Sequence, residues 1–571
     1  MSEKIELTQE ELDDIRELEE EIDEDDEIFE LEKGRLFPHQ IEGFKWMNKR
    51  AKINHHGIKG GIINLEMGLG KSLYYLKWSK EQGGTHLIVC PNIVINTFKD
   101  EIAKFFGEKE KFIVFRRDSY SAFHFANAQI IRENRWVIIN YESLMAIAKK
   151  YDTYEAILER DSADRIVGIN NAYRPSKSKT ESTKGPEILF NFPWKSVLFD
   201  ESQAFKNPRT KTFYSVMALY GETKWCTTGT PIVNSDSDLH SQLRAIGYNA
   251  STFKKQKLKE DQIEECIFTM DYTKANIKLP PLYTNEILIS LKDEELMCYK
   301  FFHCKMQEVI KEFETAGADY ACVLAMYTRL QQVSVSAYIV NDESKRNFNP
   351  SMLKEKSYIE FQDMLKKMPI GMYSWIKDRK GSAGLYSSKI LKAVKIISEI
   401  PKDEKIIVFA NYKGINDILA EKIEDSLGIE CLLLDGDIKS QQEKRNVLNS
   451  FRTSDKYRVL LLTTKTGSVG VNLTEANHVI FLSNNWAPSH TKQAIARCHR
   501  TGQTKPVHVY RLLIEGSIEI YQEKICAMKE KIEGEYISND GRISFKLMKE
   551  IMEEMNGDSD SLFKKYDKIK P

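Results

Sequence analysis

Short apolar runs alternate with amphipathic stretches along most of the chain. Nine runs have the length of β-strands; they span residues 60–65, 85–91, 136–141 and 194–199 in the first half and 405–410, 431–434, 457–462, 478–482 and 507–512 in the second. Because these runs are apolar on both faces and are separated by helical stretches such as 92–106, the pattern predicts parallel sheets covered by helices. The predicted fold class is α/β, with two parallel-sheet lobes.

Two regions interrupt the alternation. Residues 251–385 are charged and helical in rhythm, with a break at Leu279-Pro-Pro-Leu282, and we interpret them as a helical insertion and linker. Residues 174–186, within the irregular stretch 160–187, are polar, basic and bounded by Pro and Gly, which predicts a mobile surface loop. The predicted domains are an acidic tail (1–33), a first lobe (34–250), the insertion and linker (251–385), a second lobe (386–535) and a C-terminal extension (536–571).

The net charge of −1 conceals an uneven distribution. Residues 1–32 hold seventeen acidic residues against Lys4 and Arg16, so this tail carries −15 and the remainder of the chain carries +14. A basic body is typical of a protein that binds a polyanion. Apolar residues at helical spacing in the tail predict an exposed helix or a partly disordered segment. The tail is therefore a solvated segment, a docking segment for a partner, or a competitor for the basic surface.

The cysteines and the apolar runs exclude several classes of protein. Nine cysteines are scattered singly with no Cys-x-x-Cys pair, which argues against a disulfide framework and against a zinc site. No apolar run reaches the roughly 18 residues that a membrane helix needs, and the acidic N-terminus does not fit a signal peptide. We expect a protein that is not secreted, has no membrane partner and works in a reducing compartment: cytoplasm, nucleus or a viral factory.

A glycine-rich turn follows the first apolar run and is itself followed by a helical stretch. Strand, turn and helix in this order predict a phosphate-binding loop, in which Lys71 would reach the β- and γ-phosphates and Ser72 would hold Mg²⁺. The strict pattern has Gly where this chain has Leu65, so an ordinary strand–turn–helix remains an alternative for the loop alone. The residues expected to bind the nucleotide here are Met67, Gly68, Leu69, Gly70, Lys71 and Ser72.

Two further groups of residues carry candidate chemistry. Asp200 and Glu201 end an apolar run, where an Asp can hold Mg²⁺ and a following Glu can activate water, although helix N-capping would explain the pair if it stood alone. Arg497 and Arg500 are three residues apart, so we expect them to share a helix face and to act on a transferring phosphoryl group. Surface arginines are the alternative interpretation of this second pair.

Further segments occur along the chain in the same order as the motifs of one protein family. They are Leu36-Phe-Pro-His-Gln-Ile-Glu-Gly43, Val89-Cys-Pro91, Asn140-Tyr-Glu-Ser-Leu144, Phe205-Lys-Asn-Pro208, Thr227-Thr-Gly-Thr-Pro-Ile-Val-Asn234, Leu433-Leu-Asp-Gly436, Thr463 to Leu473, Asn485-Trp-Ala-Pro488 and Gln493 to Gln503. With the loop and the Asp-Glu pair, this set resembles the Swi/Snf-type ATPases of helicase superfamily two over residues 35–530. Segments 323–333 and 506–516 look like the Lodestar and transcription-release subgroup, close to its post-replication-repair relatives, in a compact form that would suit a virus.

The resemblance implies two RecA-like lobes that hydrolyse ATP with Mg²⁺ and move along double-stranded DNA as a monomer. It implies that Gln40 reads adenine, that Gly470 contacts the nucleotide, and that Gln493 acts with the two arginines to complete the site. The residues that it implies for DNA contact are Pro91, Tyr141, Thr464, Asn472 and Trp486.

The chain departs from the family pattern at several positions. Leu65 stands where Asp is usual, Gln203 stands where His is usual, and Lys465, Thr466 and Ser468 replace an Arg-Ala-Gly-Gly-like set. Gln203 can still form hydrogen bonds, and the catalytic residues are kept, so we expect an active ATPase that remodels or displaces DNA-bound proteins.

Three alternatives stay open. One is a strand-separating helicase, and another is an ATPase that releases transcripts by acting on RNA polymerase or another DNA-bound protein. The third is a non-catalytic DNA-binding scaffold that keeps the fold.

Overall fold

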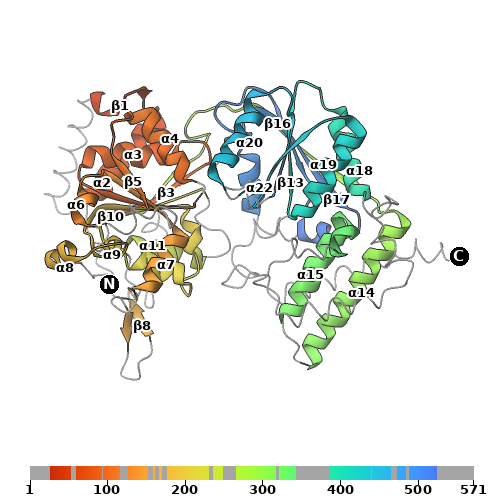
Figure 1. Ribbon diagram of the computed structural model, residues 1–571, viewed down its shortest axis with the longest axis horizontal. Coiled ribbons are helices and arrows are strands. Elements are labelled where there is room, and N and C mark those ends of the chain that lie inside the picture. The colour runs from red at the N-terminus through yellow and green to blue at the C-terminus, as the bar shows by residue number, and fades with distance from the viewer. Residues whose placement is uncertain are drawn as a thin grey trace, which may run out of the picture. The chain divides into compact units, whose positions relative to one another are not determined.

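Two compact units make up the chain, Met1–Lys278 and Leu279–Pro571, and each is described by itself (Figure 1). The computed structural model describes residues 26–52, 59–92, 94–115, 126–151, 153, 158–160, 166–169, 176–229, 236–247, 265–316, 320–341, 386–436, 438, 440–463, 472–483 and 488–523. Within these ranges, no helix combines the length and the apolar character needed to cross a membrane.

The first unit is built on a parallel sheet of seven strands in the order β11-β3-β10-β9-β4-β6-β5. The strands are β3 (Gly60–Leu65), β4 (His86–Cys90), β5 (Phe112–Phe115), β6 (Trp136–Asn140), β9 (Trp194–Asp200), β10 (Gly221–Thr228) and β11 (Ile267–Met270). The central strands β4, β6 and β9 are almost entirely buried, because helices cover both faces of the sheet. Their continuous apolar runs are therefore the ones that the sequence shows most clearly.

Helices cover the two faces of this sheet. Figure 1 shows α2, α3 and α4 on one face and α7 and α11 on the other. The helices of the unit are α2 (Pro38–Lys52), α3 (Lys71–Gln82), α4 (Ile95–Phe106), α6 (Ala128–Arg132), α7 (Tyr141–Lys150), α8 (Lys177–Ser182), α9 (Ile188–Asn191), α10 (Lys211–Met217) and α11 (Asp236–Ile246). Smaller elements are the 3₁₀ turns Asp26–Phe29 and Ser202–Phe205, the pair β1 (Glu30–Leu31) and β2 (Gly34–Arg35), and the antiparallel hairpin β7 (Leu158–Arg160) and β8 (Ile166–Ile169).

The second unit contains a parallel sheet of six strands in the order β12-β17-β16-β13-β15-β14. The strands are β12 (Leu282–Ile289), β13 (Lys405–Ala410), β14 (Cys431–Leu434), β15 (Val459–Thr463), β16 (Ala476–Phe481) and β17 (Val507–Ile514). The helices are α14 (Asp293–Ala316), α15 (Tyr320–Val335), α18 (Ser388–Glu399), α19 (Lys413–Leu427), α20 (Gln441–Thr453) and α22 (Pro488–Ile495), with a 3₁₀ turn at Ala337–Asn341. In Figure 1, α18 and α19 lie on one side of the sheet and α20 and α22 on the other.

Side-chain caps fix several helix starts. The Asn140 side chain accepts a hydrogen bond from Ser143 N at 2.7 Å, and Ser387 and Ser440 cap α18 and α20 in the same way. Such caps satisfy one of the backbone donors that the first turn of a helix leaves open. The cap at Asn140 turns the chain sharply at the end of β6, so that α7 begins at the edge of the sheet.

Buried polar contacts attach α14 and α18 to each other and to the segment that follows β17. Lys389 forms an ion pair with Glu519 at 2.6 Å, with 0% and 4% of the two side chains exposed. The Tyr299 hydroxyl of α14 accepts a hydrogen bond from Ile518 N at 2.8 Å, and Glu295 accepts one from Ser388 N at 2.7 Å. An unpaired charge at such a depth would be strongly destabilising, so the Lys389–Glu519 pair fixes α18 to the segment after β17. The Tyr299 and Glu295 contacts fix α14 to the same two elements.

The unit boundary differs from the predicted lobe boundaries. Strand β11 joins the first sheet beyond residue 250, and β12 joins the second sheet within the segment that we expected to be insertion and linker. The sequence did not show them because β11 has only four residues, while most of β12 is exposed and carries a mixed pattern. Strands β5 and β10 were also missed; β10 contains Glu222, Lys224 and three threonines among its eight residues.

The predicted mobile loop at residues 174–186 is wrong in part, because α8 forms within it. Thr180 of this helix is buried, and its hydroxyl donates to Asn191 O at 2.7 Å. That contact ties α8 to α9. The predictions for residues 1–25, for residues 342–385 of the insertion and for the C-terminal extension lie outside the described residues.

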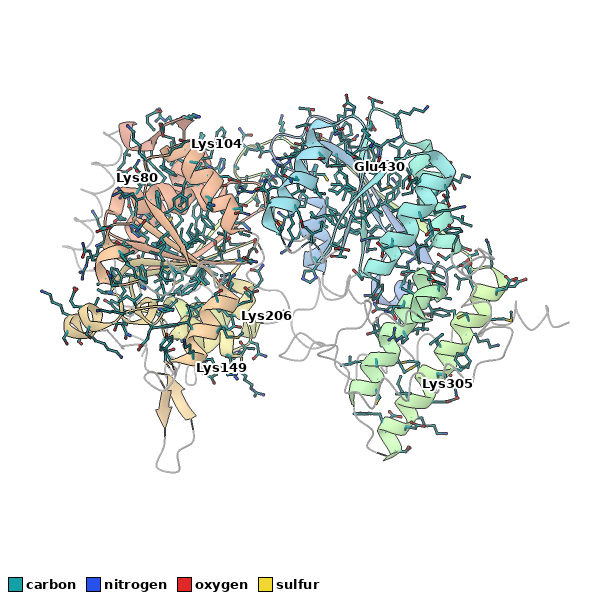
Figure 2. The ribbon with its side chains drawn as sticks, viewed as in Figure 1. Lys80, Lys104, Lys149, Lys206, Lys305 and Glu430 are labelled. Atoms are coloured by element: carbon teal, nitrogen blue, oxygen red, sulfur yellow. The ribbon has the colours of Figure 1, made fainter. Side chains whose placement is uncertain are left out.

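Basic side chains occur on both sides of the first sheet. Figure 2 shows Lys80 and Lys104 on the side of α3 and α4, and Lys149 and Lys206 on the side of α7 and α11. Lys80 is partly neutralised, since its ammonium lies 2.9 Å from Glu110. The net positive charge outside the acidic tail therefore does not by itself identify a nucleic-acid-binding face.

Candidate active site

The carboxyl ends of β3, β10 and β9 meet at one edge of the first sheet. Thr228 of β10 pairs with Asn64 of β3, and Thr227 pairs with Asp200 of β9. Since neighbouring strands lie about 4.8 Å apart, the phosphate-loop strand and the Asp-Glu strand are separated by roughly 10 Å. The topology thus brings together three segments that are far apart in the sequence.

The turn after β3 has the conformation that a phosphate loop needs. Gly68 and Gly70 have φ angles of 93° and 83°, which side chains with a Cβ atom rarely adopt, and α3 begins directly afterwards at Lys71. A Cβ atom at Gly70 would lie 2.6 Å from Gln40 Nε2, so a larger residue there would also have to displace the Gln40 amide. Backbone N–H groups and a helix N-terminus are therefore available for an anion.

The start of α2 packs against this loop. Gln40 Oε1 accepts a hydrogen bond from Phe37 N at 2.9 Å, while His39 Nε2 and Gln40 Nε2 lie 3.4 and 3.5 Å from Leu69 O. The Phe37 ring is 59% exposed and stacks on His39 at 5.8 Å between centroids. The Gln40 amide is thus placed beside the loop, as a residue that reads the base would have to be.

Asp200 is buried at the end of β9. Its Oδ1 accepts a hydrogen bond from Thr227 Oγ1 at 2.7 Å. Burial and the neighbouring Glu201 raise the pKa of Asp200 to about 6, against the lowering effects of Thr227 and Lys71. A Cβ atom on Gly229 would lie 2.8 Å from Lys71 Nζ, so the lysine head lies against the segment that follows β10. Lys71 therefore attracts the Asp200 carboxylate at this edge of the sheet.

Glu201 is held in a strained conformation by a short relay. Its φ angle is 50°, a left-handed value that Asn276 alone shares among the non-glycine residues of the described ranges. Gln203 Nε2 donates to Glu201 Oε2 at 2.5 Å, and Thr228 Oγ1 donates to Gln203 Oε1 at 2.9 Å. The link between the Asp-Glu pair and β10 is thus present with Gln at position 203. Strain at a non-glycine residue costs of order 1–3 kcal/mol and clusters at functional sites.

Two predicted DNA contacts lie at the same edge with different surroundings. Pro91 follows β4 and is partly exposed. Tyr141 is buried, its ring packs on Phe205, and its hydroxyl donates to Asp200 O at 2.8 Å. The prediction that the Tyr141 side chain contacts nucleic acid therefore does not fit the structure, because the phenol supports the Asp200 main chain from inside the lobe.

The arginine segment of the second unit is not helical throughout, which corrects the predicted shared helix face. Helix α22 ends at Ile495, and Arg497 and Arg500 follow in turns. Leu473 N donates to Arg497 O at 2.9 Å, and the buried Gln503 donates from Nε2 to Ala476 O at 2.9 Å. Contacts to the residues around the start of β16 thus hold the segment in place.

Three nearby predictions can be placed only in part. Gln493 is buried within α22, and Asn472 is exposed, with its carbonyl accepting a hydrogen bond from Arg452 at 2.8 Å. The predicted nucleotide contact Gly470 and the predicted DNA contacts Thr464 and Trp486 lie outside the described residues.

The donors for a metal ion are one carboxylate and one hydroxyl. In the part of the chain that the structure describes, no group of three or more His, Cys, Asp or Glu side chains could hold a metal on its own. The oxygen atoms of Asp200 and Ser72 are of the kind that Mg²⁺ prefers, because that ion is usually shared between one or two protein ligands, phosphates and waters.

The sequence did not single out Tyr272, which also touches the loop. Its hydroxyl donates to Met67 O at 2.5 Å. The two residues are 205 positions apart, and no motif or periodicity near Tyr272 signals the contact.

Two family models match this chain. The model described as SNF2-related domain matches residues 39–339, and the model described as helicase conserved C-terminal domain matches residues 388–502. The first match covers more than half of the chain and includes every described site residue of the first unit. The second ends beyond Arg500.

Curated relatives agree with the two family models. The chain is 31% identical to putative helicase 172L of Invertebrate iridescent virus 6 over 91% of this chain and 94% of that protein. It is 25% identical to the ATP-dependent DNA helicase DDM1 of Arabidopsis thaliana over 88% of this chain, and it spans 62% of that protein's length. A solved structure, the Sulfolobus solfataricus SWI2/SNF2 ATPase core in complex with dsDNA, matches with a TM-score of 0.34 at 21% identity, covering 87% of this chain and 92% of that one.

Proposed function

The chain belongs to the SNF2 family and is a DNA-dependent ATPase of helicase superfamily two, and on that premise we propose that it is a translocase on double-stranded DNA. The work of translocation would be to remodel or displace proteins bound to the DNA. The proposal is supported by the Asp200–Thr227 and Glu201–Gln203–Thr228 contacts at the loop edge, which fix the orientation of the two carboxylates that hydrolysis would use.

Each polar group at the sheet edge has a part in the proposed hydrolysis. The loop N–H groups and Lys71 bind the phosphates and neutralise their charge, and Gln40 reads the base. Ser72 and Asp200 would hold Mg²⁺, which when bound neutralises phosphate charge. Thr227 orients the Asp200 carboxylate through its hydrogen bond.

Glu201 is the proposed base for the attacking water. Gln203 holds one of its two carboxylate oxygens and leaves the other for the water. Because Gln203 is itself held by Thr228, a movement of β10 or of the segment after it would change the direction of the Glu201 carboxylate. The relay therefore gives the lobe a way to switch hydrolysis on and off.

The second unit would supply the charge that stabilises the transferring phosphoryl group. We assign that role to Arg497 and Arg500, whose guanidinium groups cannot lose their charge at any physiological pH, with Gln493 beside them on α22. Gln503 and Leu473 fix the main chain of the segment, so the arginines are presented from a rigid support.

DNA is proposed to run past the carboxyl edge of the first sheet at Pro91 and past Asn472 in the second unit, with Thr464 and Trp486 as further contacts. These residue types fit contacts to a sugar–phosphate backbone, which carry no sequence information. Binding should then be independent of sequence and should weaken steeply with salt.

Three assays test this function and separate it from its alternatives: third-strand release from a DNA triplex, separation of a plain duplex, and release of a stalled RNA polymerase. A translocase should release the third strand of a DNA triplex with ATP and should leave a plain duplex paired. Lys71→Ala should abolish triplex release, while the exposed Lys104→Ala should not change it. Separation of the plain duplex would favour the helicase alternative, and release of a stalled RNA polymerase without triplex displacement would favour the transcript-release alternative. Absence of ATP-dependent activity in all three assays would leave only the scaffold.

A further inference from the structure

The segment that follows β11 is bonded to the start of the phosphate loop at three points. Glu66 N donates to Met270 O at 2.9 Å, Tyr272 N donates to Glu66 Oε2 at 3.0 Å, and the Tyr272 hydroxyl donates to Met67 O at 2.5 Å. The hydroxyl contact has a consequence for the loop. Since Met67 C=O and Gly68 N–H belong to one planar trans peptide, the bond that holds the carbonyl also sets the direction of the N–H.

Beyond Tyr272 the chain forms a closed turn. Ile277 N donates to Tyr272 O at 3.0 Å, Ala275 N donates to Asp271 O at 2.9 Å, and the Asp271 carboxylate accepts from Lys274 N at 2.7 Å. Asn276 takes a left-handed conformation, with φ of 53°, and ends the turn. A turn closed by so many bonds moves as one piece, so a displacement of the loop at Met67 is passed on to Ile277.

The chain enters the second unit directly after this turn and is bonded again at once. Only Lys278 and Leu279 separate the turn from Pro280, whose carbonyl accepts a hydrogen bond from His499 Nε2 at 2.8 Å. Pro281 O accepts from Val507 N at 2.9 Å, and the two prolines restrict the backbone of this stretch. His499 stands between Arg497 and Arg500, so the first residues of the second unit are fixed to the arginine segment.

We propose that residues 271–281 form a tether that couples the phosphate loop to the arginine segment, with Tyr272 and His499 as its two positioning residues. Nucleotide binding at the loop changes the orientation of the Met67–Gly68 peptide. The tether transmits this change to the segment that carries the arginines. This inference rests on the proposed function, because it concerns how nucleotide binding and DNA binding are linked.

The test is the effect of nucleotide on DNA affinity in the full-length protein. The dissociation constant for a labelled duplex is measured by anisotropy without nucleotide and with a non-hydrolysable ATP analogue, and the ratio of the two values is the coupling. Tyr272→Phe removes only the hydroxyl and should reduce the ratio about three- to tenfold, the scale of one hydrogen bond. Tyr283→Phe, on the other side of the unit boundary, is the matched control and should keep the wild-type ratio.

A double-mutant cycle examines whether the Tyr272 and His499 contacts act through the same tether. His499→Phe keeps a ring and removes the donor to Pro280, and it should reduce the ratio as Tyr272→Phe does. If one tether carries the signal, the double variant should lose no more than either single variant. Inserting Gly-Gly between Lys278 and Leu279 leaves both bonded ends intact and should reduce the ratio by the same factor. Because this variant keeps Tyr272 and His499, it separates a loss of coupling from a folding defect caused by either substitution.

The outcomes separate the tether from the proposed function. A wild-type ratio of one would overturn the proposed function and the tether together. A wild-type ratio far from one that persists in Tyr272→Phe, or losses that add in the double variant, would overturn the tether alone.

Discussion

Asp200→Asn should stabilise the nucleotide-free first unit. Asp200 is buried beside Glu201, and its pKa is raised from 3.8 to about 6. A carboxyl with a raised pKa binds its proton more tightly in the folded state. Its ionisation therefore costs no stability below the unfolded pKa, costs progressively more between pH 4 and 6, and costs the full amount above pH 6. Asn keeps an oxygen for the Thr227 hydroxyl and removes the charge.

The magnitude follows from the shift. A displacement of about two pKa units corresponds to about 3 kcal/mol at pH 8 and to roughly half of that at pH 5. This net shift already contains the attraction of Asp200 for Lys71, so that attraction is not subtracted a second time. For a unit of this size, a gain of 2–3 kcal/mol corresponds to a rise in Tm of roughly 4–10 °C.

Thermal unfolding in EDTA, without nucleotide, at pH 5 and pH 8 measures the effect. The control is Glu108→Gln, which removes an exposed carboxylate of the same unit and should leave Tm unchanged at both pH values. The stabilisation by Asp200→Asn should be larger at pH 8 than at pH 5, and Mg²⁺ with ATP should stabilise the wild type more than the variant. A wild type as stable as the variant at pH 8 would show that Asp200 is not destabilised by its burial.

Four further predictions concern turnover and DNA binding. Glu201→Gln should bind ATP with near wild-type affinity and hydrolyse it at least about 10²-fold more slowly in single-turnover assays, since only water activation is lost. Arg500→Ala should lower kcat by roughly 10³-fold with little change in nucleotide affinity, and equal losses in both would indicate a structural arginine. Gln203→Leu breaks the link between Glu201 and Thr228 and should reduce DNA-stimulated turnover about tenfold or more, the effect of losing a supporting hydrogen bond; an unchanged rate would make the relay dispensable. Deleting residues 1–32 should tighten DNA binding, more at low salt than at high salt, if the tail competes with DNA; equal affinities of the full-length and truncated proteins at both salt concentrations would exclude the competition.

The sequence predicts the parts of this fold that are buried on both faces. The strands β4, β6, β9, β13 and β16 are continuous apolar runs because they lie in the middle of their sheets. Strands β11 and β12 lie at sheet edges, where the burial of one side is lost, and their sequences are short or mixed. Propensity and periodicity respond to continuous apolar sequence, so they miss these two edge strands and also the interior strand β10, whose charged and threonine side chains interrupt its apolar run.

The candidate site shows the same limit at the level of single residues. The positions of Lys71, Asp200 and Glu201 could be predicted, because strand ends and glycine turns have local signatures. Tyr141 was assigned to DNA because residue type and order do not report which way a phenol points. The Tyr272 contact could not be foreseen at all, since it joins segments that are 205 residues apart.

The rate of ATP turnover tests the central claim most directly. It is measured with no nucleic acid, with single-stranded DNA, with double-stranded DNA and with RNA. At matched nucleotide concentration and low salt, double-stranded DNA should raise kcat several-fold, and single-stranded DNA and RNA should raise it less. Lys71→Ala should remove the turnover under all four conditions. Equal turnover under all four conditions with the wild type, or the highest turnover with single-stranded DNA or RNA, would contradict a translocase on double-stranded DNA.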